Sequence, residues 1–258
     1  MRITAPINAI VQTLAPIIVI PARLGSTRLP GKALAEIDGR PMVAHVFERA
    51  RAAALGPVAV ATDAPEIARA IETVGGRAVL TCGSHVCGSD RIGAALRALD
   101  PQGRHGAVIN LQGDLPFLPD GALHAALALL DDPAVDIGTL ACAASADETG
   151  DPNAVKLVGV SLTPHRLRAL YFTRASAPYG EGPRLKHIGV YAFRRSALER
   201  FVSLPPSPLE LRERLEQLRA LEAGMRIDVA LLDKGAPSVD TERDLTALRA
   251  TARKQDAK

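Results

Sequence analysis

The sequence has no tryptophan, and aromatic residues make up only 3% of its 258 positions. Its formal net charge is only +3, so it gives no sign of the basic, aromatic-rich surface that binds nucleic acid. The three cysteines, Cys82, Cys87 and Cys142, are odd in number and lack C-x-x-C spacing, which excludes a disulfide framework or zinc site as the expected arrangement. No apolar run approaches the roughly eighteen residues that cross a bilayer. We therefore expect no nucleic-acid or membrane partner and a reducing, cytoplasmic location.

The ends of the chain also lack strong signals. Residues 1–15 carry a single cation, Arg2, and contain Pro6 and Asn8, so they do not resemble a signal peptide and predict a flexible leader. Residues 251–258 are predicted to be a frayed tail. Between them the 47% apolar content is enough for one large α/β core.

The first half of the chain alternates between apolar runs and helical periodicity. The pattern predicts strands at 17–20, 58–61, 78–80 and 107–111, and helices at 41–55, 65–74 and 89–99. Such alternation is typical of a parallel, helix-covered sheet that binds its ligands beyond the carboxyl ends of the strands.

The second half has a different pattern. It predicts strands with few helices between them, then one long helix, a strand and a last helix: 135–143, 154–160, 170–173 and 188–193, then 207–223, 227–232 and from 241 onward. This favours a smaller antiparallel or mixed extension that lines a substrate pocket or a dimer face.

A cation-rich loop follows the first strand. Residues 21–32, Pro-Ala-Arg-Leu-Gly-Ser-Thr-Arg-Leu-Pro-Gly-Lys, place Arg23, Arg28 and Lys32 beside two glycines whose backbone can approach a polyphosphate. The glycine spacing is one residue too long for a P-loop, Ala33 stands where that motif needs Ser or Thr, and G-x-G-x-x-G is absent. A nucleoside triphosphate is the first candidate ligand, and a plain basic surface loop is the alternative.

Two carboxylates could hold a metal ion against that triphosphate. Asp114 follows the fourth strand in Gln112-Gly113-Asp114, and Asp240 precedes the last helix. Mg²⁺ needs hard oxygen ligands and usually takes one or two carboxylates. The alternatives are a turn role for Asp114 and a helix-capping role for Asp240, with Asp244 completing a box around Thr241.

Other polar residues allow two interpretations. His85 to Arg91 could face a base or ribose, or simply supply Ser89 as a helix cap. His187 and Tyr191 share one strand face, which could be a half-exposed sheet, and Glu210 is expected to cap a helix that begins near Ser207.

At this point the motifs resemble a known family, the 3-deoxy-manno-octulosonate (Kdo) cytidylyltransferases, also called CMP-Kdo synthetases. The resemblance extends from about residue 17 to 248 and rests on these segments: 21–23, 26–32, 61–63, 88–91, 112–114, 153–156, 187–191, 207–210, 216–219 and 239–241. It implies a Rossmann-like three-layer nucleotidyltransferase fold, with a mostly parallel central sheet and a smaller mixed or antiparallel extension. One domain would cover 16–250, divided into a nucleotide-binding part (16–145), a sugar-acid and dimerisation part (146–225) and a closing strand and helix (226–250).

The resemblance also implies an activity: CMP transfer from CTP to Kdo for lipopolysaccharide synthesis, with release of pyrophosphate, a requirement for Mg²⁺, and a homodimer. By motif position, the catalytic residues would be Arg23, Lys32, Asp114 and Asp240, the two aspartates being the metal ligands. The nucleotide-binding set would be Ala22, Arg23, Gly25, Arg28, Lys32, Gly88, Ser89 and Arg91. The sugar-acid set would be Gln112, Arg174, His187, Tyr191, Glu216 and Gln217, with Arg174 pairing with the sugar carboxylate.

Several positions differ from the family pattern. Leu115 stands where an acid is usual, Cys87 replaces a serine, Lys186 replaces an arginine, and the link from Arg174 to His187 is short. These differences leave open a modified acceptor, such as 8-amino-Kdo or another ulosonic acid. A nucleotide-binding regulator on the same fold and a nucleotidyltransferase for a neutral sugar phosphate are further alternatives.

Overall fold

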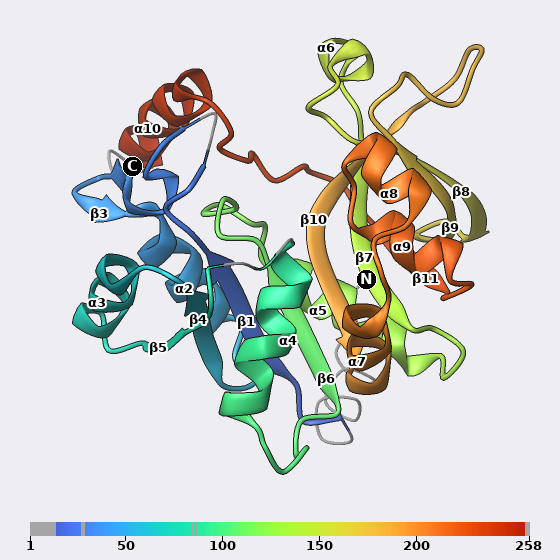
Figure 1. Ribbon diagram of the computed structural model, residues 1–258. Helices are drawn as coiled ribbons and strands as arrows, with labels where there is room; N and C mark the ends of the chain where they lie inside the picture. Colours follow the sequence, from blue (N-terminus) through green and yellow to red (C-terminus); the bar gives the residue numbers. More distant parts are fainter. Residues whose placement is uncertain (1–13, 27–28, 84, 86, 256–258) are drawn as a thin grey trace. The chain divides into compact units, whose positions relative to one another are not determined.

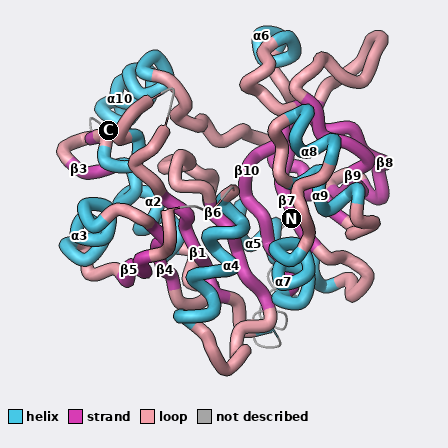
Figure 2. Tube along the Cα trace, viewed as in Figure 1, coloured by secondary structure: helices cyan, strands magenta, loops and turns pink. Residues whose placement is uncertain are grey.

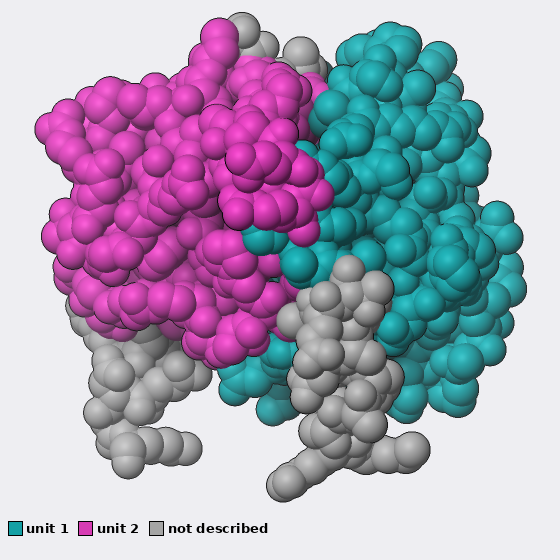
Figure 3. All heavy atoms as spheres, turned by 90° about the horizontal axis from the view of Figure 1, so that it is seen from below, with its two compact units in different colours: residues 1–15, 105–109, 119–235 teal, residues 16–104, 110–118, 236–258 magenta. Residues whose placement is uncertain are grey.

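A computed structural model describes residues 14–26, 29–83, 85 and 87–255. The chain folds into two compact units that alternate along the sequence. Unit 1 comprises residues 1–15, 105–109 and 119–235, and unit 2 comprises residues 16–104, 110–118 and 236–258 (Figure 3). Strand β6 (Ala107–Leu111) crosses the division, because its first three residues belong to unit 1 and its last two to unit 2. The proposed domain boundaries stay a prediction.

Unit 2 contains the alternating elements that the sequence predicts (Figure 1). In chain order they are β1 (Ile17–Ala22), the 3-10 helix η1 (Lys32–Leu34), β2 (Glu36–Ile37), β3 (Arg40–Pro41), α2 (Met42–Ala52), β4 (Val58–Thr62), α3 (Pro65–Thr73), β5 (Arg77–Leu80), α4 (Gly88–Leu99) and α10 (Glu242–Gln255). Strands β1, β4 and β5 pair in parallel, with Val19 opposite Ala59 and Val60 opposite Ala78. The prediction of a parallel sheet is confirmed.

Apolar burial explains why this sheet forms. Ile18, Val19 and Ile20 are fully buried, as expected for a strand covered on both faces. Helices α2 and α3 pack on the strands and against each other, and α4 packs on β1, β4 and β5. The parallel order leaves the loops after β1 and β4 at one edge of the sheet.

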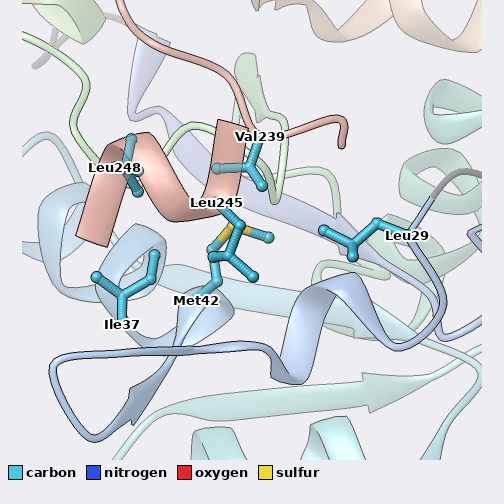
Figure 4. Packing of buried hydrophobic residues seen from close by; sticks show 6 residues of the cluster. All are labelled: Leu29, Ile37, Met42, Val239, Leu245 and Leu248. Carbon is cyan, nitrogen blue, oxygen red and sulfur yellow. The ribbon is translucent and has the colours of Figure 1, made fainter. Parts of the chain in front are cut away.

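The end of the chain packs against the start of unit 2. Figure 4 shows Val239, Leu245 and Leu248, from the last loop and α10, facing Met42, Ile37 and Leu29. These six side chains form a buried cluster, the α10 cluster, in which none is more than 8% exposed. The cluster fixes the loop that carries Asp240, although more than two hundred residues of sequence separate it from β1. Helix α10 continues to Gln255, into the stretch predicted as a frayed tail.

Unit 1 is a mixed sheet with helices (Figure 2). Besides β6 its elements are α5 (Ala122–Ala128), η2 (Leu129–Asp131), β7 (Ile137–Ala143), α6 (Ala146–Gly150), β8 (Lys156–Thr163), β9 (Arg166–Thr173), β10 (Leu185–Arg194), α7 (Arg195–Ser203), α8 (Pro208–Glu213), α9 (Gln217–Glu222) and β11 (Ile227–Leu232). The order β10-β7-β11-β9-β8 contains one parallel pair, β7 with β11, and antiparallel pairs elsewhere. This confirms the mixed extension.

The prediction of one helix over 207–223 is wrong. The chain forms α8 and α9, separated at Arg214, whose φ of +56° lies in the left-handed region and ends the first helix. The sequence has no glycine or proline there to signal the break. Helices α5 and α7 were not predicted, and the strand predicted at 135–143 begins two residues later, at Ile137.

The two capping predictions for α4 and α8 have different outcomes. The cap of α4 is Cys87 and not Ser89, which lies inside the helix and accepts a hydrogen bond from Asn110 Nδ2 (3.3 Å). The prediction for Ser89 is therefore wrong. The capping role of Glu210 is confirmed, since Glu210 Oε2 accepts from the Ser207 N–H (3.0 Å) at the start of α8.

Candidate active site

The loop after β1 places Lys32 at the sheet edge. Gly31 has a φ of +69°, a conformation that L side chains rarely adopt, and its N–H donates to Leu24 O (3.2 Å). This turn closes the loop and starts η1 with Lys32 as its first residue. Arg28 and Thr27 lie outside the described residues, so the role predicted for Arg28 stays a prediction.

Lys32 joins the two predicted metal ligands. Its Nζ lies 2.8 Å from Asp114 Oδ2 and 3.2 Å from Asp240 Oδ1. The three side chains are 18–26% exposed, so the group is partly screened from water but open to a ligand. Burial disfavours the charged amine, but the two carboxylates outweigh it and raise the pKa of Lys32 above its ordinary value. Two carboxylates distant in sequence therefore converge on one cation.

Backbone contacts hold Asp240 in this position. The Val239 N–H donates to Asp114 O (3.1 Å), which ties the last loop to the loop after β6. The predicted box around Thr241 is present: Asp244 Oδ2 accepts from the Thr241 N–H (2.8 Å), and Thr241 Oγ1 accepts from the Asp244 N–H (3.3 Å). Because Thr241 and Asp244 cap α10, the carboxylate of Asp240 can face Lys32.

These side chains line a cavity of about 270 Å³, the larger cavity. Its lining is Pro21, Ala22, Arg23, Ser26, Lys32, Ala33, Gln112, Gly113, Asp114 and Asp240, all in unit 2. A Cβ on Gly113 would lie 3.1 Å from Pro21 O, so any larger residue at this position would press against the backbone of β1. Ser26, Ala33 and Gly113 were not predicted as site residues, although each lies in a loop or turn that follows a predicted strand.

A second cavity of about 130 Å³, the smaller cavity, adjoins the first and shares part of its lining. It is lined by Pro21, Ala22, Arg23, His85, Cys87, Gly88, Arg91 and Gln112. Arg91 is held by Asp63 Oδ2 (2.8 Å) and Thr81 Oγ1 (2.7 Å). His85 Nε2 is buried and has no hydrogen-bond partner in the described part of the chain, so a bound ligand could supply one.

Two of the predicted nucleotide-binding residues, Ser89 and Gly25, are not among the described residues that line either cavity. Ser89 is only 1% exposed and bonds Asn110, whose Oδ1 in turn accepts from Gln112 Nε2 (3.1 Å). Ser89 therefore helps to orient the Gln112 amide. Neither Ser89 nor Gly25 belongs to the described lining of the two cavities.

The donor set of the larger cavity suits a hard divalent cation. The described residues contain no cluster of three or more His, Cys, Asp or Glu side chains. Two aspartates beside an open cavity offer the hard oxygen ligands that such a divalent cation takes, with water or phosphate oxygens in its other positions. The Lys32 ammonium lies within ion-pair distance of both aspartates, so the two carboxylates already bind one positive charge.

The predicted sugar-acid residues apart from Gln112 lie in unit 1. His187 and Tyr191 on β10 are buried, with ring centroids 5.4 Å apart, and Phe172 packs edge-on to His187. Gln217 at the start of α9 is 4% exposed, and Glu216 is the N-cap of that helix. Their binding of a sugar stays a prediction.

The hydrogen bonds of Thr139 fix the tautomer of His187. Thr139 Oγ1 donates its one hydrogen to Val190 O (2.7 Å), so it accepts from His187 Nε2 (2.9 Å). The imidazole is thus protonated on Nε2 and has its lone pair on Nδ1. Burial lowers the pKa of His187 to about 3, so the ring stays neutral near pH 7.

Arg174 already has several protein partners. Its Nε donates to Glu213 O (2.9 Å), Nη1 to Pro152 O (2.9 Å) and Nη2 to Arg214 O (3.3 Å). These bonds hold the guanidinium over the break between α8 and α9. A guanidinium has five N–H donors, so two remain for a carboxylate. The predicted pairing with the sugar acid stays a prediction.

Comparison with known proteins gives consistent matches. Residues 17–227 match the family described as cytidylyltransferase. The chain is 61% identical over 91% of its length to the 3-deoxy-manno-octulosonate cytidylyltransferase of Methylobacterium nodulans, covering 96% of that protein. It is 58% identical over 90% of its length to the protein of the same name from Rhodopseudomonas palustris strain BisA53, covering 95% of it.

Solved structures agree with these relatives. The fold matches a CMP:2-keto-3-deoxy-manno-octonic acid synthetase complexed with CTP, with a TM-score of 0.85, 39% identity, and coverage of 93% of this chain and 99% of that one. A cytidylyltransferase from Leptospira borgpetersenii, at 16% identity and a TM-score of 0.58, shares the fold over 91% of this chain and 85% of its own. Within the described residues, no helix is long and apolar enough to span a membrane.

Proposed function

Because the chain belongs to the 3-deoxy-manno-octulosonate cytidylyltransferase family, we propose that it transfers CMP from CTP to Kdo and releases pyrophosphate. The product serves lipopolysaccharide synthesis, and the reaction takes place in the cytoplasm. One observation supports this above all others: Lys32, Asp114 and Asp240 converge at the cavity that Arg23 and Ser26 also line.

The two cavities suggest how CTP lies. The larger cavity, which Arg23 and Lys32 line, would take the triphosphate, and the smaller one, which His85 lines, would take the nucleoside. The shared residues Pro21, Ala22 and Arg23 would then lie along the α-phosphate. Arg23 and Lys32 neutralise charge that builds on the phosphates as pyrophosphate leaves.

Positioning is the main task of these residues. The anomeric hydroxyl of the sugar acid must approach the α-phosphorus in line with the leaving pyrophosphate, and holding two reactants in this geometry removes much of the entropic barrier. Mg²⁺ on Asp114 and Asp240 would lower the pKa of that hydroxyl when bound. Neutral His187, with its lone pair on Nδ1, can accept a hydrogen bond from a sugar hydroxyl but cannot serve as an acid near pH 7.

Acceptor comparison tests the proposal. Pyrophosphate release is measured with CTP and Mg²⁺, and with Kdo, 8-amino-Kdo, sialic acid or a sugar 1-phosphate as the second substrate. We expect Kdo to give the largest kcat/KM. A preference for 8-amino-Kdo would move the assignment to a modified acceptor, and CTP binding without turnover of any acceptor would favour a regulator.

A homodimer is part of the proposal. Val160 and Leu162 on β8 and Leu170 on β9 are 45–56% exposed, and β8 is the last strand in the order of its sheet within the described residues. Val160 pairs with Arg168, and the register of β8 with β9 shifts at Leu162 and at Leu170, so the three exposed apolar side chains lie on two directly paired strands. A second copy of this chain would cover such a patch.

Replacement of Leu170 by lysine tests this surface. We expect Leu170→Lys to shift the sedimentation coefficient from dimer to monomer. Leu80→Lys, at a 61% exposed leucine of unit 2, is the matched control and should not change it. Monomeric wild-type protein at micromolar concentration would contradict the proposed dimer.

A further inference from the structure

The position of Lys32 bears on the order in which ligands bind. Lys32 Nζ lies between one oxygen of Asp114 and one of Asp240, at 2.8 and 3.2 Å. A magnesium ion bound by the same oxygens would lie about 2.0–2.1 Å from each, which leaves no room for the ammonium between them. Lysine and metal therefore compete for one position.

We propose that Lys32 keeps divalent cations out of the nucleotide-free site, so that metal enters only together with a triphosphate. This inference rests on the proposed function, because it takes the incoming ligand to be CTP. The triphosphate offers Lys32 new anionic partners within the same cavity, which Lys32, Arg23 and Ser26 all line. Movement of the ammonium onto phosphate oxygens frees both carboxylates for the metal at the moment when the phosphates also need it.

The arrangement also explains how the carboxylates stay together before a metal binds. Asp114 and Asp240 carry like charges that repel each other, and the Lys32 ammonium lies within ion-pair distance of both. Lys32 has a flexible four-carbon stem, so its ammonium can move between carboxylates and phosphates without backbone change. It is a positioning residue for the metal ligands before it is a ligand of the phosphates.

Binding of Mn²⁺ to the free protein tests the proposal without any turnover. We expect wild-type protein to bind Mn²⁺ weakly in calorimetry or electron paramagnetic resonance, and Lys32→Met to bind it about 5–150-fold more tightly, the usual range of coupling between two ligands. Mn²⁺ should also raise the melting temperature of Lys32→Met more than that of wild type. Lys32→Gln provides a second neutral variant if methionine impairs folding.

Two controls localise the effect. Lys234→Met removes the same charge at an exposed lysine of unit 1 and should leave Mn²⁺ affinity unchanged. Lys32→Met combined with Asp114→Asn should lose the gain, because one of the two carboxylates is gone.

Mn²⁺ binding measured with CTP present distinguishes a failure of the role proposed for Lys32 from a failure of the proposed function. With CTP present, wild type should gain Mn²⁺ affinity, and Lys32→Met should gain less because its site is already open. Equal Mn²⁺ affinity of wild type and Lys32→Met without nucleotide would overturn the role of Lys32, even if CTP binds. Absence of CTP binding to wild type would instead contradict the proposed function.

Discussion

At the scale of single residues, the carboxylates are the most direct test of the site. Asp114→Asn and Asp240→Asn keep the shape of each side chain but remove its charge. We expect each to lower kcat about 10²–10³-fold at saturating Mg²⁺, because each removes an electrostatic group that acts in the transition state. The measurement is pyrophosphate release from CTP and Kdo.

A matched variant makes this result specific. Asp38→Asn changes an exposed aspartate of unit 2 whose φ of +49° asparagine tolerates well. It should keep full activity. Near-normal turnover of Asp114→Asn would show that this carboxylate does not hold the metal.

His85 gives a second prediction at this scale. Because its Nε2 is buried without a partner among the described residues, a nucleotide in the smaller cavity can complete its hydrogen bonding. We expect His85→Ala to weaken CTP binding about tenfold, the effect of one lost hydrogen bond, with little change in kcat. Calorimetry with CTP measures it, and His85→Gln should restore part of the affinity. Unchanged affinity in His85→Ala would place the nucleoside elsewhere.

The sequence predicted the residues at the sheet edge better than their neighbours. Lys32 and Asp114 could be identified because each follows a strand of a predicted parallel sheet, and such strand ends converge. The residues around Asp240 fitted a helix-capping role equally well, so its metal role was predicted only through the family resemblance. The bonds of Arg91 to its two partners could not be predicted in this way, since they depend on how α4 packs on the strands. The backbone contacts of Arg174 likewise depend on a helix break that has no sequence signal.

At the scale of elements, α10 holds the last carboxylate in place through the α10 cluster. Leu245 is 2% exposed and packs with Met42 and Val239 (Figure 4). Leu245→Ala should lower the free energy of unfolding by about 2–5 kcal/mol, the cost of a cavity in a packed core. Urea unfolding measures this change.

An exposed leucine supplies the comparison for this element. Leu211→Ala, at a 65% exposed position, should change the free energy of unfolding by no more than about 0.5 kcal/mol. A similar small effect of Leu245→Ala would mean that α10 contributes little to the stability of unit 2.

The helices and strands of the first half could be predicted because the spacing of apolar residues and the positions of glycine and proline indicate the same boundaries there. Strand β11 and helix α3 were also found close to their bounds, since glycine and proline mark their ends. The break between α8 and α9 was missed because propensity favours helix through Arg214. Across the break, Glu210 forms a buried ion pair with Arg219 (2.8 Å from Nε to Oε2), a contact that two residues nine apart on one continuous helix could not make. A contact of this kind, between two helices, leaves no periodic pattern in the sequence.

At the scale of the whole molecule, buried His187 links stability to pH. Its pKa is about 3 in the folded protein and near 6.5 when unfolded, so between these values the unfolded chain binds the extra proton. Stability from this residue is therefore fully present above pH 6.5 and falls as pH drops towards 3, by at most about 1.4 kcal/mol per pH unit.

Urea unfolding from pH 8 to pH 4 measures this linkage. We expect His187→Gln to be less stable than wild type at pH 8, because it disturbs the contact with Thr139, but to lose less stability on acidification. His165→Gln, at an exposed turn histidine, should follow the wild-type slope. If His187→Gln also follows that slope, the expected difference in proton uptake at His187 is absent, and the folded ring must be accessible to protons near neutral pH. A shallower slope would instead support burial as the cause that keeps the imidazole neutral and able to accept a hydrogen bond from a sugar hydroxyl.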